Sequence, residues 1–484
     1  MDNKQLSLQK KLNPTSLWAL AFGCIIGWGS FINPGKKFLP NSGVAGTAIA
    51  MLLGALVMII IAFSYAYIVP KCPKAGGEFS FTKSCFGKKM AFVCGWFLIA
   101  AYLTNVPMNS TAIGLIVDGL FGPVLKWGFH YEIAGFEVWL GEILLASFIL
   151  ILFAVLNILG VEKAGFVQTI LALLLIVSVF VLFIGAVASP YATVENMDPI
   201  WGFDKAGAVA SGGYDASHAV KDSGIAGSIL ATFAIAPWAF VGFDTIPQAA
   251  EEFKCSYKKV IFIMVIAIAF GCFVYIANNS IAAAALENWP DLIANAEGTP
   301  WLLLTASEKI LGPFGKVLVG IAVSCAVLSG IMGFYLAASR LMYSMSKDGY
   351  LPSTFGKIDE KRKTPKNAII FCMIISLAGP VLGREALGWF VDMSAIGASI
   401  GFMFTCLSTY KTMKRDGDGT LMLKILSILG SAFSMAFMVL QLIPIPGLEG
   451  VHFGWQSYIM LGVWVVIGLI FYFVKRKTIN ASED

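Results

Sequence analysis

The residues with the clearest chemical potential lie in the stretch FGCIIGWGSFINPG, residues 22 to 35. Gly23, Gly27 and Gly29 fall in a run that is long and apolar enough to cross a membrane, and Pro34 closes it. Each glycine disfavours a helix interior by about 1 kcal/mol relative to alanine. The run therefore predicts a helix that unwinds near its middle, which a membrane protein tolerates only beside other protein or a water-filled cavity.

A break of this kind has the right chemistry for a small zwitterion. The N–H groups at the start of a half-helix attract a carboxylate, and the freed carbonyls nearby attract an ammonium group. An α-amino acid carries both groups two bonds apart, so Gly27 and Gly29 indicate an amino-acid site. The alternative is close helix packing, because Gly23 and Gly27 also have the spacing of small residues at helix interfaces.

Asp244 is the second candidate for a functional residue. It lies in FAIAPWAFVGFDTIPQ, residues 233–248, an apolar run that Pro237, Gly242 and Pro247 interrupt. An ionisable residue inside a membrane span is a functional hypothesis by default. Asp244 would act as a gate, as a proton carrier or as the partner of a cationic group on the substrate. The alternative is a structural carboxylate that accepts hydrogen bonds from nearby backbone.

The composition shows what kind of protein holds these residues. Of 484 residues, 58% are hydrophobic and 13% are charged, about half the charged share of a soluble protein. Apolar runs of about 20 residues recur, each long enough to cross a bilayer core. Twelve spans are predicted, at residues 15–35, 43–70, 90–117, 139–159, 165–188, 224–248, 259–285, 316–345, 367–383, 387–411, 421–444 and 456–474. We therefore expect an all-α membrane protein with twelve transmembrane helices, in contact with the lipid bilayer, whose first and sixth helices are broken.

The predicted spans divide into halves. A polar segment separates spans five and six, so the first ten spans form two sets of five, and the odd number makes the second set inverted. Interrupted helices at matching positions of two halves indicate a transporter site at the bilayer midplane. The expected divisions are an N-terminal tail at 1–14, inverted repeat 1 at 15–188, an outer loop at 189–223, inverted repeat 2 at 224–411, and helices eleven and twelve with the C-terminal tail at 412–484.

The basic residues set the expected orientation. Most of the 34 Lys and Arg residues fall on the cytoplasmic side when the N-terminus is placed there, as the positive-inside rule requires. We therefore expect both termini in the cytoplasm and the chain in the plasma membrane, which in a prokaryote is the inner membrane. The net charge of +5 then reflects orientation, and no nucleic-acid partner is expected.

The sequence argues against an enzyme or a metal protein. The nine cysteines lie in predicted spans or cytoplasmic segments, which predicts no disulfide framework. The three histidines lie in outer loops, so no intramembrane cluster of His and Cys suits a metal or a haem. We therefore expect no catalytic residues, no metal and no cofactor.

Four segments, in order and in the expected spans, resemble the amino acid–polyamine–organocation (APC) superfamily of transporters. They are GCIIGWGSFINPG in the first span, PKAGGEFSFTKSCFGKKMAFVCGWF between the second and third, WAFVGFDTIPQAAEEFK in the sixth, and ASRLMYSMSKDGYLP at the end of the eighth. The resemblance covers essentially the whole chain. It implies the five-plus-five inverted-repeat fold and secondary transport of amino acids or related amines by alternating access.

The resemblance also implies which residues hold the substrate. They are Ile25, Gly27, Trp28, Gly29, Ala236, Trp238, Phe240, Asn105, Met108 and Ser394. In the first helix, the three N–H groups at the break would bind the carboxylate, and the Ile25 carbonyl would receive the amine. The sixth helix would add carbonyls near Ala236 and two aromatic walls or gates. NVPM is similar to the N-x-x-M of bacterial arginine/agmatine exchangers, and it nominates the side-chain pocket, although Met108 could equally fill the core.

Some positions depart from the family pattern. Trp28 stands where many members have a small residue, which favours a small substrate or a lid role for its ring. Asp244 replaces the commoner Glu, and Leu175 occupies a position where some proton-coupled members carry Lys, which argues against Lys-based coupling. A sodium site would need oxygens from the first and eighth spans. Ser329 is the candidate there, although a serine in a membrane helix more often bonds backbone or a neighbour.

Charged residues near the cytoplasmic helix ends have simpler expected roles. Arg340 is expected to extend to the membrane interface, as long basic side chains do. Glu251 and Glu252 are expected to pair with nearby lysines, and an inner-gate role is the alternative.

The sequence leaves the mechanism of transport open. An amino acid or amine substrate carried with H⁺ or Na⁺ is one interpretation. The alternatives are an antiporter that exchanges an amino acid for an amine, and an amino-acid sensor that keeps the fold without transport.

Overall fold

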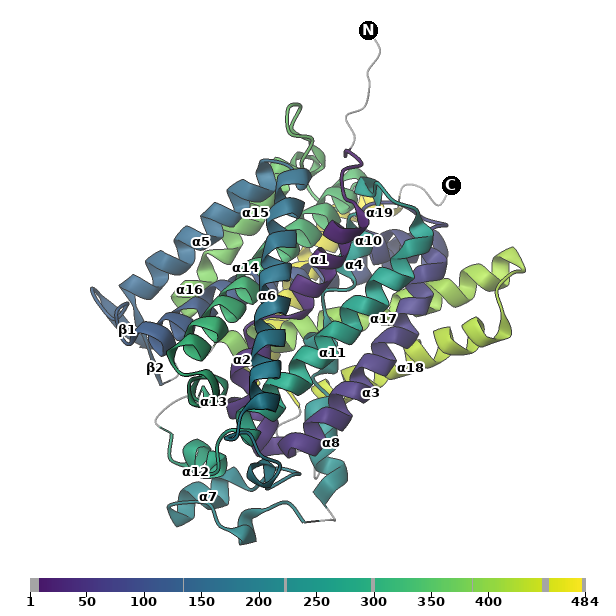
Figure 1. Ribbon diagram of the computed structural model, residues 1–484. Helices are drawn as coiled ribbons and strands as arrows, with labels where there is room; N and C mark the ends of the chain where they lie inside the picture. The colour runs from purple at the N-terminus through teal and green to yellow at the C-terminus, as the bar shows by residue number, and fades with distance from the viewer. Residues whose placement is uncertain are drawn as a thin grey trace.

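The computed structural model describes residues 8–133, 135–221, 224–296, 301–384, 386–445 and 452–480, and most of them are helical (Figure 1). The α-helices are α1 (Pro14–Ile25), α2 (Gly29–Asn33), α3 (Leu39–Ile68), α4 (Gly77–Phe121), α5 (Leu140–Ile158), α6 (Val161–Ala188), α7 (Lys205–Ser211), α8 (Ile225–Phe233), α9 (Ala236–Phe240), α10 (Thr245–Gln248), α11 (Val260–Ala284), α12 (Trp289–Ala294), α13 (Leu302–Leu311), α14 (Pro313–Lys347), α15 (Lys366–Ser376), α16 (Ala378–Leu382), α17 (Ala386–Asp416), α18 (Leu421–Leu442) and α19 (Trp455–Asn480). The short π- and 3₁₀-helices are η1 (Pro34–Phe38), η2 (Glu195–Met197), η3 (Ala216–His218), η5 (Ala250–Glu252), η6 (Tyr257–Lys259) and η7 (Ser353–Gly356), and the strands are β1 (His130–Ile133) and β2 (Phe136–Trp139).

The chain is a membrane protein by the length and composition of its helices. Nine helical segments within the described residues are long and apolar enough to cross a membrane. The other three predicted spans correspond to shorter helices, namely α1, α8 to α10, and α15 with α16, while α2 continues into α3 within the first of the nine segments. Twelve spans and an inverted repeat stay predictions, as do the domain boundaries. Of those divisions, residues 1–7, 222–223 and 481–484 lie outside the described part of the chain.

The first helix begins where its sequence dictates. The Asn13 side-chain oxygen accepts the Ser16 N–H at 2.8 Å, and Pro14 occupies the first helical position, where its missing N–H is not needed. α19 ends toward the same end of the bundle at which α1 begins, whereas α7 and α12 lie at the opposite end (Figure 1). The start of α1 and the end of α19 therefore lie toward one end of the bundle, and the side of the membrane on which they lie stays a prediction.

Three helices form the centre of the bundle. In their most apolar stretches, 83% of the residues of α4 and 78% of those of α14 and α17 are buried, against 28% for α18 and 11% for α19. Because lipid is as apolar as the side chains it contacts, the exposed apolar surface of α18 and α19 suits a membrane. The interior of the bundle is therefore formed mainly by α4, α14 and α17.

The connection between α4 and α5 departs from the all-helical expectation. β1 and β2 pair antiparallel, with His130 opposite Trp139 and Ile133 opposite Phe136, and Gly135 takes a left-handed conformation at the turn. The segment between α6 and α8 was expected to be an outer loop. In its described residues it contains α7 together with η2 and η3.

The segment before α1 is joined to the chain that follows α10. Leu12 forms a parallel β-bridge with Phe253. The N–H groups of Lys11 and Leu12 each donate to the Glu252 carbonyl at 2.9 Å, and the Lys254 N–H donates to the Leu12 carbonyl at 2.8 Å. Three backbone hydrogen bonds therefore tie the start of the first helix to the end of the second broken helix.

Candidate substrate-binding site

The predicted break in the first helix is present. The last hydrogen bond of α1 runs from the Ile26 N–H to the Phe22 carbonyl at 3.0 Å. Ile26 is then extended, with φ −94° and ψ 105°, and α2 begins at Gly29. Among the described residues, no acceptor takes the N–H groups of residues 27–29. These donors are therefore available to an anion, as the amino-acid interpretation requires.

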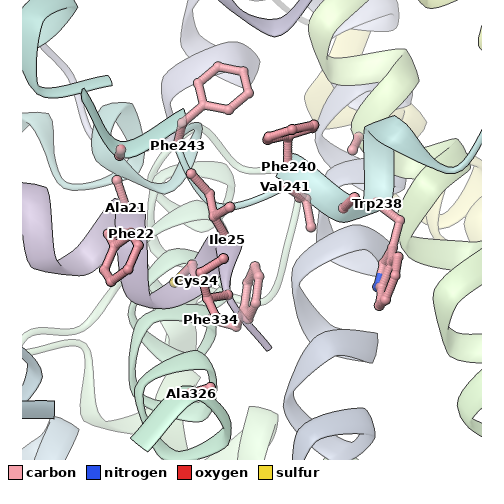
Figure 2. Packing of buried hydrophobic residues seen from close by; sticks show 14 of the residues in the cluster. Ala21, Phe22, Cys24, Ile25, Trp238, Phe240, Val241, Phe243, Ala326 and Phe334 are labelled. Atoms are coloured by element: carbon pink, nitrogen blue, oxygen red, sulfur yellow. The ribbon is translucent and has the colours of Figure 1, made fainter. Parts of the chain in front are cut away.

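The second break lies directly against the first. Between α9 and α10, Val241 leaves the helical conformation, with φ −55° and ψ 130°, and Gly242 has φ +138°, a conformation that residues with side chains rarely adopt. A Cβ on Gly242 would lie 2.6 Å from the Ile25 nitrogen and 2.7 Å from the Cys24 Cβ. Figure 2 shows Cys24 and Ile25 beside Val241 at this junction. Glycine is therefore needed at 242 both for its conformation and for the close approach of the two backbones.

Two tryptophans cover one side of the breaks. The ring centroids of Trp28 and Trp238 lie 6.3 Å apart, and the two residues are only 3% and 6% exposed. A Cβ on Gly29 would overlap the end of the Trp238 ring. The cavity that both rings line holds about 20 Å³, which is room for about one water molecule. The site is closed on this side, and the lid role for Trp28 stays a prediction.

The predicted side-chain pocket brings α4 and α17 together. The Asn105 amide donates to the Ser394 hydroxyl at 2.7 Å and to the Ala101 carbonyl at 2.7 Å. Met108, one turn along α4, is 2% exposed. Two of the nominated polar residues therefore share one hydrogen bond, and Met108 lies in the packed interior.

Asn109 is a candidate that the sequence reasoning missed. Its amide oxygen has no partner among the described residues and lies 3.2 Å from the position that a Cβ on Gly27 would take. Its amide nitrogen donates to the Asn105 carbonyl at 2.9 Å. The spacing of four between Asn105 and Asn109 places both on one helix face, and this was the signal that could have identified it.

Ala236 and Phe240 lie in α9 with Trp238 and pack against α3. A Cβ on Gly54 of α3 would be 2.8 Å from the Ala236 Cβ and 3.2 Å from the Phe240 ring. The Phe240 ring also lies 6.1 Å from that of Tyr275 on α11. The Tyr275 hydroxyl in turn donates to the Ile25 carbonyl at 3.4 Å. Tyr275 is thus a further neighbour of the carbonyl that was nominated to receive the amine.

Asp244 accepts hydrogen bonds from both backbone and side chain. One carboxylate oxygen accepts the Gly242 N–H at 2.7 Å, and the other accepts the Tyr102 hydroxyl at 2.8 Å. The backbone bond is the one that the structural alternative predicted. Tyr102 belongs to α4, so Asp244 also connects the second break to the centre of the bundle.

A second buried carboxylate, Glu78, belongs to the same network. Its two oxygens accept the Tyr65 hydroxyl at 2.6 Å and the Gln248 amide. The Gln248 amide also donates to the Tyr102 hydroxyl at 3.3 Å, and these residues and Asp244 are fully buried. Glu78 stands inside the GGEF motif but received no role from the sequence, because nothing local predicts that α10 covers it.

Ser329 links α14 to α1. Its buried hydroxyl donates to the Gly23 carbonyl at 3.0 Å and to the Ala326 carbonyl at 2.9 Å. This is the backbone bonding that the alternative to a sodium ligand described. The described residues hold no group of three or more His, Cys, Asp or Glu side chains placed to bind a metal ion.

The expectation for Arg340 was wrong. Arg340 is 1% exposed, and its guanidinium bonds the two Glu252 oxygens at 2.7 and 3.3 Å. It therefore lies inside the bundle and pairs with an acid that was expected to bond a lysine. The other acid, Glu251, accepts the Ala75 N–H at 3.1 Å.

A polar cavity lies beyond the tryptophan pair. It holds about 390 Å³ and is lined by residues that include Lys36, Asp118, Trp301 and Arg384. One Arg384 nitrogen donates both to Asp118 and to Glu142 of α5. Lys36 also lines the narrow cavity at the tryptophans, so the two cavities adjoin at this residue.

The comparisons with known proteins agree on one class, because each of the proteins named below is a permease or a transporter. The sequence profile of the amino acid permeases matches residues 12–470. The branched-chain amino acid permease BcaP of Bacillus subtilis is 25% identical, over 97% of this chain and 94% of that protein. The human large neutral amino acids transporter small subunit 2 is 27% identical, over 77% of this chain and 64% of that protein. The methylthioribose transporter of Bacillus subtilis is 22% identical, over 98% of this chain and 95% of that protein.

Proposed function

The chain belongs to the amino acid permease family, a family of transporters and not of enzymes, and from that premise we propose that it is a secondary active transporter which moves neutral amino acids by alternating access. It acts in the plasma membrane, the inner membrane of a prokaryote, with both termini in the cytoplasm. The two inverted repeats predicted from the sequence rock against each other around the breaks in the first and sixth helices.

The observation that carries this proposal is the contact between the two breaks. The N–H groups of residues 27–29 have no acceptor among the described residues, and Gly242 packs on the backbone of Cys24 and Ile25. The substrate carboxylate binds the N–H groups, and the amine binds the Ile25 carbonyl and carbonyls near Ala236. The groups that an amino acid needs therefore lie at one junction of two helices.

The neighbours of this junction favour a neutral side chain. Trp28, Trp238 and Met108 are apolar, and Asn105 and Asn109 carry no charge. The nearest acid, Asp244, already accepts hydrogen bonds with both oxygens. The printed names of two relatives, for branched-chain and for large neutral amino acids, agree with this choice, whereas the name of a third specifies methylthioribose.

The test is a ligand screen on the detergent-purified protein, followed by transport. Leucine, its methyl ester, the amine that lacks its carboxylate, arginine and methylthioribose are added to a thermal-unfolding assay. A ligand at about 100 times its Kd stabilises the folded state by about 2.7 kcal/mol. We expect leucine to raise the unfolding temperature and the ester and amine to leave it unchanged. An equal shift with the amine would contradict the binding of a carboxylate at residues 27–29.

Transport in proteoliposomes separates the remaining alternatives. A symporter accumulates labelled leucine in empty vesicles under an ion gradient. An antiporter takes it up only when the vesicles contain a substrate to exchange, and a sensor binds leucine in the unfolding assay without any uptake. Counterflow into leucine-loaded vesicles is expected for the first two, so its absence despite binding would refute transport.

A further inference from the structure

Two carboxylates are buried together behind the substrate junction. Glu78 at the start of α4 and Asp244 between α9 and α10 are both 0% exposed. Gln248 donates to Glu78 and to the Tyr102 hydroxyl, and Tyr102 donates to Asp244 at 2.8 Å. A continuous chain of hydrogen bonds therefore joins the two acids, which are 166 positions apart in the sequence.

The described surroundings of this pair contain no positive charge that could balance it. The titratable groups that face it are Tyr65 on α3, Tyr102 and Cys94 on α4, and Cys24 on α1. In the described part of the chain, no Lys, Arg or His side chain pairs with either acid. Arg340 on the adjacent α14 is engaged by Glu252.

Burial of two such acids has a definite electrostatic consequence. Each ionised carboxylate loses its hydration, and their mutual repulsion is strong because little water screens it. Two carboxylates that share one site therefore do not both stay ionised, and one retains a proton. The burial of this pair therefore suits a site that holds one proton.

We propose that Glu78 and Asp244, joined through Tyr102 and Gln248, form one proton-binding site that couples proton movement to substrate transport. The pair takes a proton from water on one side of the membrane and releases it to water on the other side, so one positive charge moves with the neutral substrate. This inference rests on the proposed transport function and adds its coupling ion. It also assigns a role to Glu78, to which the family resemblance gave none.

The link to the substrate is short. The Gly242 N–H donates to Asp244 at 2.7 Å. Gly242 also packs against the nitrogen of Ile25, at the end of α1 and next to the N–H groups of residues 27–29. Asp244 also accepts the Tyr102 hydroxyl of α4, so a movement of the second break relative to α4 changes the hydrogen bonding of Asp244. Protonation of the pair and opening of the junction are then coupled, because each changes the free energy of the other.

The Gln248 side chain can hydrogen-bond Glu78 in either protonation state. Its amide nitrogen donates to Glu78, and its amide oxygen is buried with no partner among the described residues. An amide that turns over presents this oxygen instead, and the oxygen accepts the O–H of a protonated Glu78. The network thus accommodates both protonation states with the same residues.

The experiment uses the full-length protein in proteoliposomes, with the membrane potential clamped. Leucine counterflow without a pH gradient measures exchange, and leucine accumulation under a one-unit pH gradient measures coupling. One proton per leucine gives about tenfold accumulation, since one pH unit is worth about 1.4 kcal/mol. A pH dye inside the vesicles reports the proton that enters with leucine.

We expect Glu78→Gln to keep counterflow, to lose accumulation under the gradient and to flatten the pH profile of uptake. Glu78→Asp, which keeps a titratable group, should retain part of the accumulation. Glu287→Gln is the matched control, because the Glu287 side chain is 77% exposed at the surface. It should behave like the unmodified protein in both assays.

The outcomes separate this inference from the proposed function. Binding of leucine without counterflow in the unmodified protein would refute transport itself. Normal counterflow with no gradient-driven accumulation and no dye signal in the unmodified protein would overturn proton coupling. Unchanged accumulation in Glu78→Gln would overturn the role of the pair. If Glu78→Gln does not fold, Glu78→Asp decides the question, because accumulation and a pH profile equal to those of the unmodified protein would overturn the role of the pair.

Discussion

Replacing Gly29 by alanine tests the geometry of the substrate junction most directly. The added Cβ would overlap the end of the Trp238 ring and would lie 3.0 Å from the Asn33 amide nitrogen. The indole is rigid and buried, so either the ring or the break has to move. We expect Gly29→Ala to raise the KM for leucine strongly while the protein still folds.

The expected size of the effect follows from the overlap. Forcing one extra carbon into a packed interior costs about 1–3 kcal/mol, and each 1.4 kcal/mol is tenfold in affinity. The KM should therefore rise by about 5- to 150-fold. Gly27→Ala is the matched control, because its Cβ would lie 3.2 Å from the Asn109 amide oxygen, which only has to give way slightly.

The assay is leucine counterflow over a range of concentrations, with unfolding temperatures measured in parallel. Trp238→Phe shortens the ring that the new Cβ meets, so the double variant Gly29→Ala with Trp238→Phe should recover part of the lost affinity. A double-mutant cycle then gives a coupling energy for two residues that touch. Equal KM values for the two alanine variants, or a coupling energy of zero, would refute the reasoning from the overlap.

Three further substitutions test other parts of the molecule. Asn109→Ala removes the amide oxygen that faces the first break, and the loss of one hydrogen bond of about 1 kcal/mol should raise the KM for leucine about fivefold; an unchanged KM in counterflow would exclude contact with the substrate. Arg340→Met leaves Glu252 buried and unpaired, so we expect a loss of about 3–5 kcal/mol in the free energy of unfolding. A large fall in unfolding temperature should report it, and Glu252→Leu added to it should recover most of the fall. Arg384→Met removes the cation that bonds Asp118, but these side chains are each 19% exposed, so a smaller fall of about 1 kcal/mol is expected. A larger fall for Arg384 than for Arg340 in the same assay would contradict this ranking by burial.

The sequence predicted the parts of the structure that depend on local properties. Long apolar runs identify membrane helices regardless of their neighbours, and nine are found in the described residues. Glycine and proline inside such runs disfavour a helix wherever they occur, so the breaks at 26–28 and 241–244 could be placed from residue types alone. Asn105 and Ser394 were nominated from a resemblance, and their hydrogen bond confirms only that they are neighbours.

The parts that could not be predicted depend on contacts between distant segments. Glu78 becomes notable only because Gln248, 170 positions away, covers it. Arg340 looked like a residue for the membrane interface because nothing near it in the sequence shows that Glu252 lies opposite. Gly29 indicated a break, but not that the Trp238 ring occupies the space of its missing side chain. Each of these contacts follows from helix packing, which an apolar pattern alone does not determine.

The backbone bonds between residues 11–12 and 252–254 have a practical consequence for measuring motion. Because Leu12 and Phe253 belong to one small ladder, we expect the start of the first broken helix and the end of the second to move together. A spectroscopic label on either segment should then report the displacement of both, and the distance between two labels placed on this pair should stay constant. Pairs with one label on this ladder and one on a helix of the surrounding bundle are therefore the ones that should record relative motion.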